Sequence, residues 1–417
     1  MTPNLAVWLI AAASTAAVIT RPFRLPEAVW AVSGAALLVV PGLLPWHDAL
    51  RAVAKGGDVY LFLTGMMLLS EIARREGVFD WAAAWAARRA KGSAPRLFLL
   101  IYGVGTVVTA FLSNDAAAVV LTPAVFAATK AADVKEPLPY LFICAIIANA
   151  ASFILPISNP ANLVLYASRT PPLPTWLAHF ALPSLLAVAV TYAALRFAQR
   201  GSLREPISTD IEQPELSRGG RIAACGIGVT AAVLLAASSF DIQLGLPTAI
   251  AGGLTAAAVL VTAREAPWGV LKGVSWAVLP LVAGLFVLVE GLGHTGVLAR
   301  LAGLLHAAAQ SSLQGTAWGA GALIAVASNL VNNLPAGLVA ADAVGQAHPP
   351  QAVTDALLVG VDLGPNLSVT GSLATILWLT ALRRDGQEVG FWQFLRLGAL
   401  VMPPALLLAL AGLLLVG

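Results

Sequence analysis

Long apolar stretches recur along the whole chain, and short polar segments separate them. Clear examples are residues 29–44, 138–155, 222–237 and 397–416. As helices, such stretches are suited to crossing the roughly 30 Å of hydrocarbon in a bilayer. No part of the chain reads as a separate soluble domain. The pattern therefore predicts an all-α integral membrane protein that crosses the bilayer many times.

The second half of the chain repeats the first. Four residues recur at a constant offset of 219 positions: Gly65, Glu71, Gly77 and Val78 correspond to Gly284, Glu290, Gly296 and Val297. A repeat at a fixed offset indicates two copies of one structural unit. We predict a first unit at 1–198, a polar cytoplasmic linker at 199–220 and a second unit at 221–417.

Each unit reads as three helices, an apolar pair with a polar tip, a long segment broken by a polar motif, and a closing helix. The apolar pairs are 95–130 and 316–345, and the broken segments are 138–170 and 351–382. If each pair is a re-entrant hairpin, each unit crosses five times and the second copy is inverted. The predicted fold has two inverted repeats, about ten transmembrane helices and two re-entrant hairpins, with broken helices at the midplane.

The distribution of positive charge gives an orientation, because Lys and Arg are more frequent in cytoplasmic segments. With the N-terminus outside, only four of the 24 Lys and Arg residues fall in outer segments: Arg51, Lys55, Arg169 and Arg300. We therefore predict a multi-pass protein of the bacterial or archaeal cytoplasmic (inner) membrane, with both termini outside.

Polar residues at the predicted breaks are the candidate binding residues. Irregular backbone at membrane depth persists only where it is buried in protein or lines a wet cavity, and carriers use such breaks to bind substrate. The alternative is that these side chains only join helices through hydrogen bonds. The candidates are Ser113, Asn114, Asn149, Ser158, Asn159, Asn162, Asn332, Asn333, Thr370, Gly371 and Ser372.

Two acids lie beside these motifs and are the candidates for proton coupling. Asp115 follows Ser113-Asn114 directly, and Asp362 precedes the second broken motif. A carboxylate is costly at membrane depth when charged, which favours reversible protonation. The alternative is a permanently hydrogen-bonded structural acid. Glu71 and Glu290 end equivalent helices, where pairing with Arg at the interface is the simpler interpretation.

Composition limits other classes of function. Hydrophobic residues make up 59% of the chain and charged residues 11%, and the net charge of +3 reflects loop placement rather than nucleic-acid binding. The two cysteines are too few for a three-thiolate site, and the five histidines lack metal-ligand spacing. No Ser or Cys at membrane depth has an evident His partner. We predict no metal, no cofactor and no enzymatic activity.

Four longer motifs carry a family resemblance: Phe-Leu-Ser-Asn-Asp at 111–115, Ile-Ser-Asn-Pro-Ala-Asn at 157–162, Ser-Asn-Leu-Val-Asn-Asn-Leu-Pro at 328–335 and Gly-Ser-Leu-Ala-Thr at 371–375. They resemble the ArsB family of arsenite/antimonite efflux pumps, within the ion transporter superfamily. The resemblance implies export of trivalent arsenic or antimony hydroxide in exchange for protons. It also implies that a soluble arsenite-stimulated ATPase sometimes docks on the cytoplasmic face.

Other transport functions stay open. Superfamily relatives that carry dicarboxylates with sodium have Ser-Asn-Thr at both hairpin tips, whereas this chain has Ser-Asn-Asp at 113–115 and Asn-Asn-Leu at 332–334. The added acid disfavours an anionic substrate. A sodium-coupled carrier, a sodium/proton exchanger and a passive channel for neutral hydroxides are the alternatives.

Overall fold

The computed structural model describes residues 2–166, 170–212 and 214–416, and within these ranges every regular element is a helix. This confirms the predicted all-α class. In chain order the first half contains α1 (Pro3–Thr20), α2 (Glu27–Val39), α3 (Trp46–Lys55), α4 (Gly57–Arg75), α5 (Val78–Arg89), α6 (Ala94–Phe111), η2 (Ala116–Val120), α7 (Leu121–Ala131), α8 (Leu138–Ala150), η3 (Pro156–Ser158), α9 (Pro160–Tyr166) and α10 (Leu173–Ala198).

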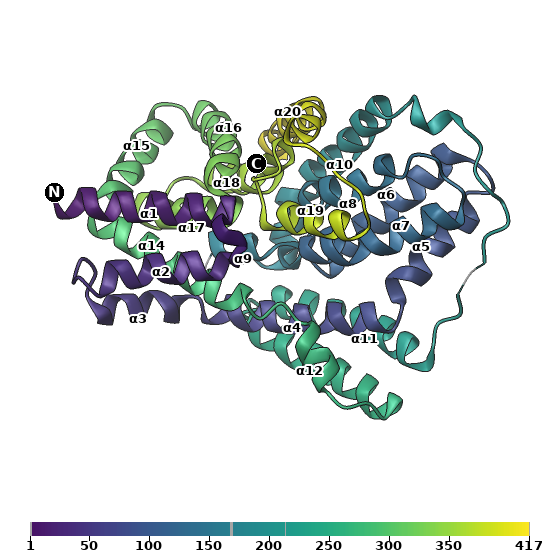
Figure 1. Cartoon of the computed structure of the whole chain (residues 1–417). Coiled ribbons are helices and arrows are strands. Elements are labelled where there is room, and N and C mark those ends of the chain that lie inside the picture. Colours follow the sequence, from purple (N-terminus) through teal and green to yellow (C-terminus); the bar gives the residue numbers. More distant parts are fainter. Residues whose placement is uncertain (1, 167–169, 213, 417) are drawn as a thin grey trace.

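The second half follows the same order of long and short helices (Figure 1). It contains α11 (Arg218–Ser239), α12 (Gly245–Ala263), α13 (Trp268–Gly273), α14 (Val278–His294), α15 (Val297–Ser311), α16 (Leu313–Val331), α17 (Asn333–Ala347), α18 (Gln351–Leu363), η6 (Gly364–Leu367), α19 (Leu373–Arg384) and α20 (Phe391–Val416).

Fewer helices are long enough to cross a membrane singly than the sequence predicts. Six described helices qualify by length and composition, or up to eight if the bent pairs α3–α4 and α14–α15 each count as one span. The prediction of about ten treated each broken segment as one span, but the breaks leave shorter pieces such as α8 and α9. The predicted helix 28–44 ends at Val39, and residues 167–169 of the predicted segment 138–170 lie outside the described residues.

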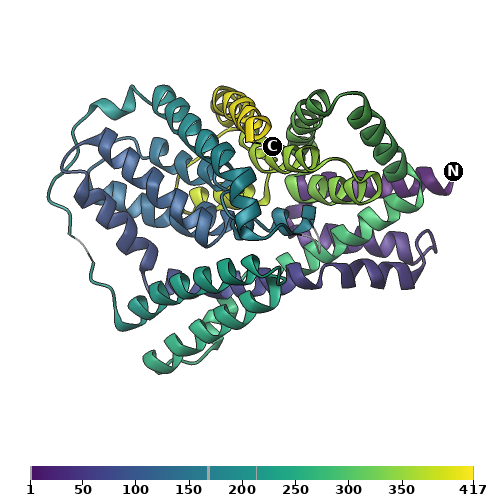
Figure 2. The same cartoon turned by 180° about the vertical axis from the view of Figure 1, so that it is seen from behind.

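The two halves are interlocked through reciprocal pairs of helices. The fourth helix of the first half, α4, packs along α12, and its counterpart α14 packs along α2, as Figures 1 and 2 both show. Glycine makes this approach possible, because a Cβ on Gly65 would overlap the carbonyl of Thr248 and one on Gly284 would meet the backbone of Ala31. Small residues let helix backbones approach closely in membranes. Each half therefore completes its packing only against the other.

Two adjacent glycines of α12 test this packing. A methyl group on Gly252 would overlap the carbonyl of Gly65, whereas one on Gly253 would point into open space. We expect Gly252→Ala to destabilise the protein by about 1–3 kcal/mol, because the helices would have to separate. The control Gly253→Ala should not destabilise it. Thermal unfolding of the purified variants measures both, and equal midpoints would contradict close α4–α12 packing.

The segments 95–130 and 316–345, which are predicted as hairpins, each contain two helical legs. The first hairpin is α6 with η2 and α7, and the second is α16 with α17. The second half of each broken segment is a separate helix, α9 in the first copy and α19 in the second. The described part of the linker runs over the ends of α5 and α7, where the Ser208 N–H donates to the Ala132 carbonyl (2.8 Å) and Ile207 and Ile211 are buried.

Candidate functional site

The four polar motifs each stand where a new helix begins. The first turn of a helix leaves backbone N–H groups unpaired, and a side-chain oxygen just before it can accept from one of them. Such bonds form from Ala116 N–H to Ser113 Oγ (3.3 Å), Ala161 N–H to Asn159 Oδ1 (3.0 Å), Leu334 N–H to Asn332 Oδ1 (3.3 Å) and Thr375 N–H to Ser372 Oγ (3.1 Å). Short polar residues thus serve first to start helices at these buried breaks.

The two hairpin tips present repeat-equivalent asparagines. Asn114 and Asn333 are each 4% exposed. Asn114 Oδ1 accepts from the N–H of Asp115 (2.9 Å), and its Nδ2 donates to no described residue. Asn333 donates its backbone N–H to the Gly371 carbonyl (2.8 Å), and its side chain bonds to none of the residues described. Both tips therefore keep amide groups for another partner.

Asp362 forms a buried hydrogen bond between the two halves of the chain. This fully buried side chain accepts a hydrogen bond from Asn159 Nδ2 at Oδ1 (2.8 Å). Its other oxygen, Oδ2, has no hydrogen-bond partner among the residues that the structure describes. A buried carboxyl group with an unpaired oxygen is costly when charged, so the arrangement suits a group that takes up and releases protons.

A second bond across the halves mirrors the first. Asn149, at the end of α8, donates from Nδ2 to Asn366 Oδ1 (3.0 Å) and Thr375 Oγ1 (3.4 Å). Asn149 Oδ1 and Asn366 Nδ2 are buried and have no hydrogen-bond partner in the described part of the chain. Asn149 and Asp362 occupy corresponding places, eleven residues after α8 and α18 begin. Each therefore reaches into the broken segment of the other half.

The returning legs of the hairpins also cross between halves. The leg η2, which follows Asp115, packs against α19, which begins after Ser372. The leg α17 packs against α9, which begins after Asn159. Each hairpin tip is thus brought to the broken segment of the opposite copy. The carboxyl group of Asp115 is partly exposed and accepts no hydrogen bond from the residues described.

Several predicted binding residues are already engaged within the chain. Ser158 Oγ donates to the Ala110 carbonyl (3.0 Å), and Thr370 Oγ1 donates to the Asn329 carbonyl (2.8 Å). Asn162 Nδ2 donates to the carbonyl of Ser152 (2.8 Å). The first two bonds hold the hairpins to the broken segments, and the third lies within the first broken segment. For these residues, the arrangement matches the alternative interpretation of helix joining.

Sequence reasoning missed residues that complete this network. Asn329 Oδ1 accepts from the N–H and Oγ of Ser368 (3.0 and 2.9 Å), and its Nδ2 donates to the Gly364 carbonyl (2.9 Å). Asn366 and Thr375 are fully buried partners of Asn149. Each is a polar residue inside an apolar segment, which was the available signal. Asn329 even lies within the motif at 328–335.

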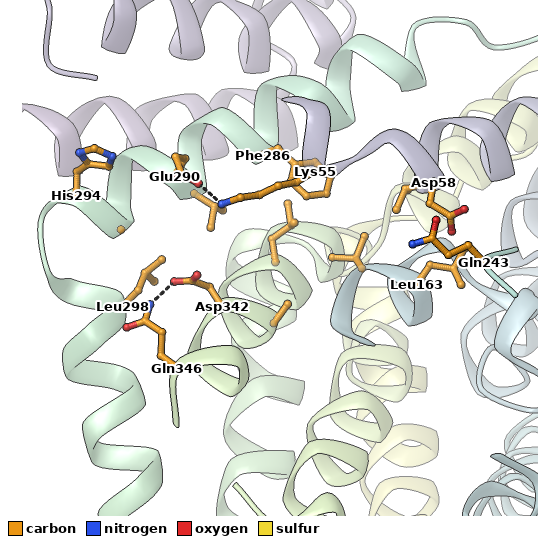
Figure 3. Close-up of a pocket in the computed structure, with 16 residues that line it drawn as sticks. Lys55, Asp58, Leu163, Gln243, Phe286, Glu290, His294, Leu298, Asp342 and Gln346 are labelled. Carbon is orange, nitrogen blue, oxygen red and sulfur yellow. Dashed lines mark hydrogen bonds and ion pairs between the residues drawn. The ribbon is translucent and has the colours of Figure 1, made fainter. Parts of the chain in front are cut away.

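A pocket of about 580 Å³ opens beside this network (Figure 3). On one side, Lys55 Nζ forms an ion pair with Glu290 Oε2 (2.7 Å), and on another Gln346 Nε2 donates to Asp342 Oδ2 (2.8 Å). Leu163 of α9 and Leu338 of α17 line the pocket about one helical turn beyond the asparagines that precede or begin these helices. The pocket therefore approaches the polar breaks from one side of the molecule.

The two repeat-equivalent glutamates are both paired, but differently. Glu71 forms an ion pair with Arg74 (2.7 Å), as predicted. Glu290 pairs instead with Lys55, from the other half of the chain. The prediction of an Arg partner at Glu290 was wrong, because α14 lies beside the junction of α3 and α4. This pair therefore joins the two halves along one side of the pocket.

Comparison with known proteins gives a consistent result. The family model described as citrate transporter (CitMHS) matches residues 11–361. The chain is 28% identical over 424 residues to the arsenical pump membrane protein of Escherichia coli K12, covering 95% of each chain. It is 28% identical over 377 residues to the protein of the same name from Yersinia enterocolitica, covering 84% of each. An uncharacterized transporter, Rv2684 of Mycobacterium tuberculosis, is 26% identical over 403 residues.

The fold also has a solved counterpart. The crystal structure of the Alcanivorax borkumensis YdaH transporter matches with a TM-score of 0.58 over 89% of this chain and 87% of that one. Sequence identity is 16%, so this likeness concerns the fold alone. The neighbour's structure is described as having an unusual topology.

Proposed function

Because the chain belongs to the citrate transporter (CitMHS) family of membrane transporters, we propose that it is a secondary carrier that exports trivalent arsenic or antimony hydroxide in exchange for protons. The relatives named arsenical pump membrane proteins, which match over as much as 95% of the chain, support this substrate. The predicted ArsB resemblance points the same way. In this proposal the protein is a carrier and catalyses no chemical conversion.

The observation that carries the proposal is the pair of hairpin-tip amides. Asn114 and Asn333 are buried, repeat-equivalent and free to donate from Nδ2. Trihydroxy arsenic is small and uncharged near pH 7, and each of its three hydroxyl groups both donates and accepts hydrogen bonds. Amide side chains also donate and accept, so two such asparagines suit this solute. Thiolate ligands are not required.

The charge of the interior argues against an anionic substrate. The buried charged side chains of the described residues are Glu71, Asp355 and Asp362, and no Lys or Arg is buried among them. A polyanion such as citrate would need cationic partners to offset its loss of hydration. A neutral hydroxide needs none. The site therefore favours the arsenical over the substrate in the family's description.

Asp362, with Asp115 as the second acid, is proposed to carry the coupled proton. Oδ2 of Asp362 is buried and unpaired, and a proton on it would remove the cost of the charge. Asn159, which donates to this carboxyl group, directly precedes α9, and α9 packs against the hairpin leg α17. Protonation is thereby able to alter the hydrogen bonds of a candidate binding motif.

The energy of one proton is sufficient for resistance. A proton that crosses a potential of ~150 mV releases about 3.5 kcal/mol. At about 1.4 kcal/mol for each tenfold ratio, this sustains a gradient of roughly a few hundred-fold for a neutral solute. The proposed activity therefore does not require a partner ATPase. We place the protein in the cytoplasmic membrane, with both termini and the pocket of Figure 3 facing outwards.

The test is arsenite uptake into inside-out vesicles that contain the purified protein. An acidic lumen provides the only driving force, and sodium is left out of both solutions. We expect accumulation of arsenite that collapses when a protonophore is added. Empty vesicles are the control.

Two results would overturn the proposal. Uptake that occurs only with sodium would support a sodium-coupled carrier. Arsenite that equilibrates without accumulating would indicate a passive channel for neutral hydroxides. Adding citrate as a competitor tests the family's described substrate, and we expect no inhibition, because no buried cation is available to bind it.

A further inference from the structure

A second buried acid lies away from the hairpin tips, near the start of α18. Asp355 is 2% exposed and is bound by residues of three helices. Its Oδ1 accepts from the Tyr166 hydroxyl of α9 and from Gln351 Nε2 (2.6 Å). Its Oδ2 lies 2.7 Å from His179 Nδ1 of α10. Tyr166 and His179 are the titratable groups in contact with Asp355 among the described residues.

The histidine connects this buried acid to the surroundings. The side chain of His179 is 26% exposed, whereas that of Asp355 is 2% exposed. Trp176 is fully buried one turn earlier on α10, and its ring lies against that of Tyr166 (centroids 5.6 Å apart). The tryptophan thus closes one side of the cluster. The half-buried imidazole of His179 is the part of the cluster nearest to the surface.

Asp355 and Asp362 each form a hydrogen-bonded pair across the interface between α9 and α18, which we call the α9–α18 seam. Tyr166 bonds to Asp355, and Asn159 bonds to Asp362. The two pairs are seven residues apart on each of the two segments. Their order is reversed between the segments, so the segments run in opposite directions. Seven residues are two helical turns, or roughly 10 Å along α18. The acids therefore face the same partner segment.

Two buried polar atoms near these pairs form no hydrogen bond with the described residues. They are Oδ1 of Asn162, which lies on α9 between Asn159 and Tyr166, and Oδ2 of Asp362. Buried polar groups of this kind are the ones that bind internal water. Water bound at these atoms would connect Asp355 towards Asp362 along α9.

We propose that His179, Tyr166 and Asp355 form a proton-uptake station, and that the α9–α18 seam delivers protons from Asp355 to Asp362. This inference rests on the proposed proton-coupled export. His179 takes a proton from water at Nε2 and releases the proton of Nδ1 to Asp355 Oδ2, so the imidazole ends neutral. Asp355 becomes a neutral carboxylic acid. Water in the seam then passes the proton to Asp362. In the proposed orientation this station faces outwards, where protons enter during export.

The experiment compares two transport modes of Asp355→Asn in inside-out vesicles, whose lumen corresponds to the outside. We expect accumulation driven by an acidic lumen to fall at least tenfold. Exchange of labelled for unlabelled arsenite needs no net proton movement and should fall less than twofold. Asp48→Asn is the matched control, because it removes an acid of α3 away from the seam. Its driven accumulation should equal that of the wild type.

His179→Gln gives a second readout that a structural role would not change. We expect the luminal pH for half-maximal uptake to move to lower values, since Asp355 would take protons directly from water. Imidazole added to the lumen should partly restore the rate. Full driven accumulation by Asp355→Asn, or an equal loss of exchange and accumulation, would overturn the inference while leaving the proposed function standing. If the wild type builds no gradient, the proposed function fails and the inference fails with it.

Discussion

Replacement of Asp362 by Asn is expected to abolish arsenite accumulation driven by a pH gradient. Asparagine has nearly the same shape and keeps an oxygen that can accept from Asn159 Nδ2, so the helix break should persist. It cannot bind and release a proton at the position of Oδ2. A gradient of two pH units stores about 2.7 kcal/mol, or roughly a hundredfold accumulation for one proton. We expect this to fall to no accumulation.

The measurement is labelled arsenite in inside-out vesicles at fixed luminal and external pH. Asp80→Asn, at an exposed acid on α5, serves as the control and should accumulate arsenite as the wild type does. Arsenite exchange needs no net proton movement and should persist in Asp362→Asn. Its persistence would show that the variant folds and binds substrate. Accumulation that survives this substitution would remove Asp362 from the coupling path.

Substitution of the hairpin-tip asparagines is expected to weaken arsenite binding equally from either half. Asn114→Ala and Asn333→Ala each remove one side-chain hydrogen bond, worth about 0.5–1.5 kcal/mol, or roughly a three- to tenfold loss of affinity. The double variant should lose about ten- to a hundredfold if both amides bind the same molecule. The KM for arsenite exchange measures these changes, with Asn4→Ala, an exposed amide of α1, as the control.

A double-mutant cycle separates shared binding from general disruption. Two amides on one substrate should give losses that nearly add or are weakly coupled. If Asn333→Ala leaves KM unchanged while Asn114→Ala raises it, the symmetric site would be wrong. A fall in the thermal midpoint of either variant would instead identify a packing role.

The sequence was sufficient to predict the breaks because their chemistry is local. Asn, Ser and Pro beside apolar stretches are incompatible with an uninterrupted helix, and the helix starts fall within a few residues of the predicted positions. Asn114 and Asn333 could also be matched by the repeat offset alone. The repeat in the sequence therefore indicated two positions, Asn114 and Asn333, at which polar side chains are buried.

The partners of those side chains could not be predicted, because they come from the other half. Nothing near Asn159 in sequence indicates that it bonds to Asp362, 203 positions away. Asp355 was overlooked although it lies within the predicted segment 351–382, because it is not beside a polar motif of the breaks. Its burial depends on Tyr166 and His179, supplied by separate helices. Helix crossing between repeats, rather than local propensity, determines these contacts.

The interlocking of α2 with α14 and of α4 with α12 also has a consequence for how the protein is made. When α4 leaves the ribosome, its partner helix does not yet exist, because α12 begins 188 residues after the start of α4. At about 5–20 residues per second, this interval lasts roughly ten to forty seconds. During it, the glycine faces of the nascent first half lie against lipid or insertion machinery. Assembly of the first half must therefore await α12 and α14 of the second half.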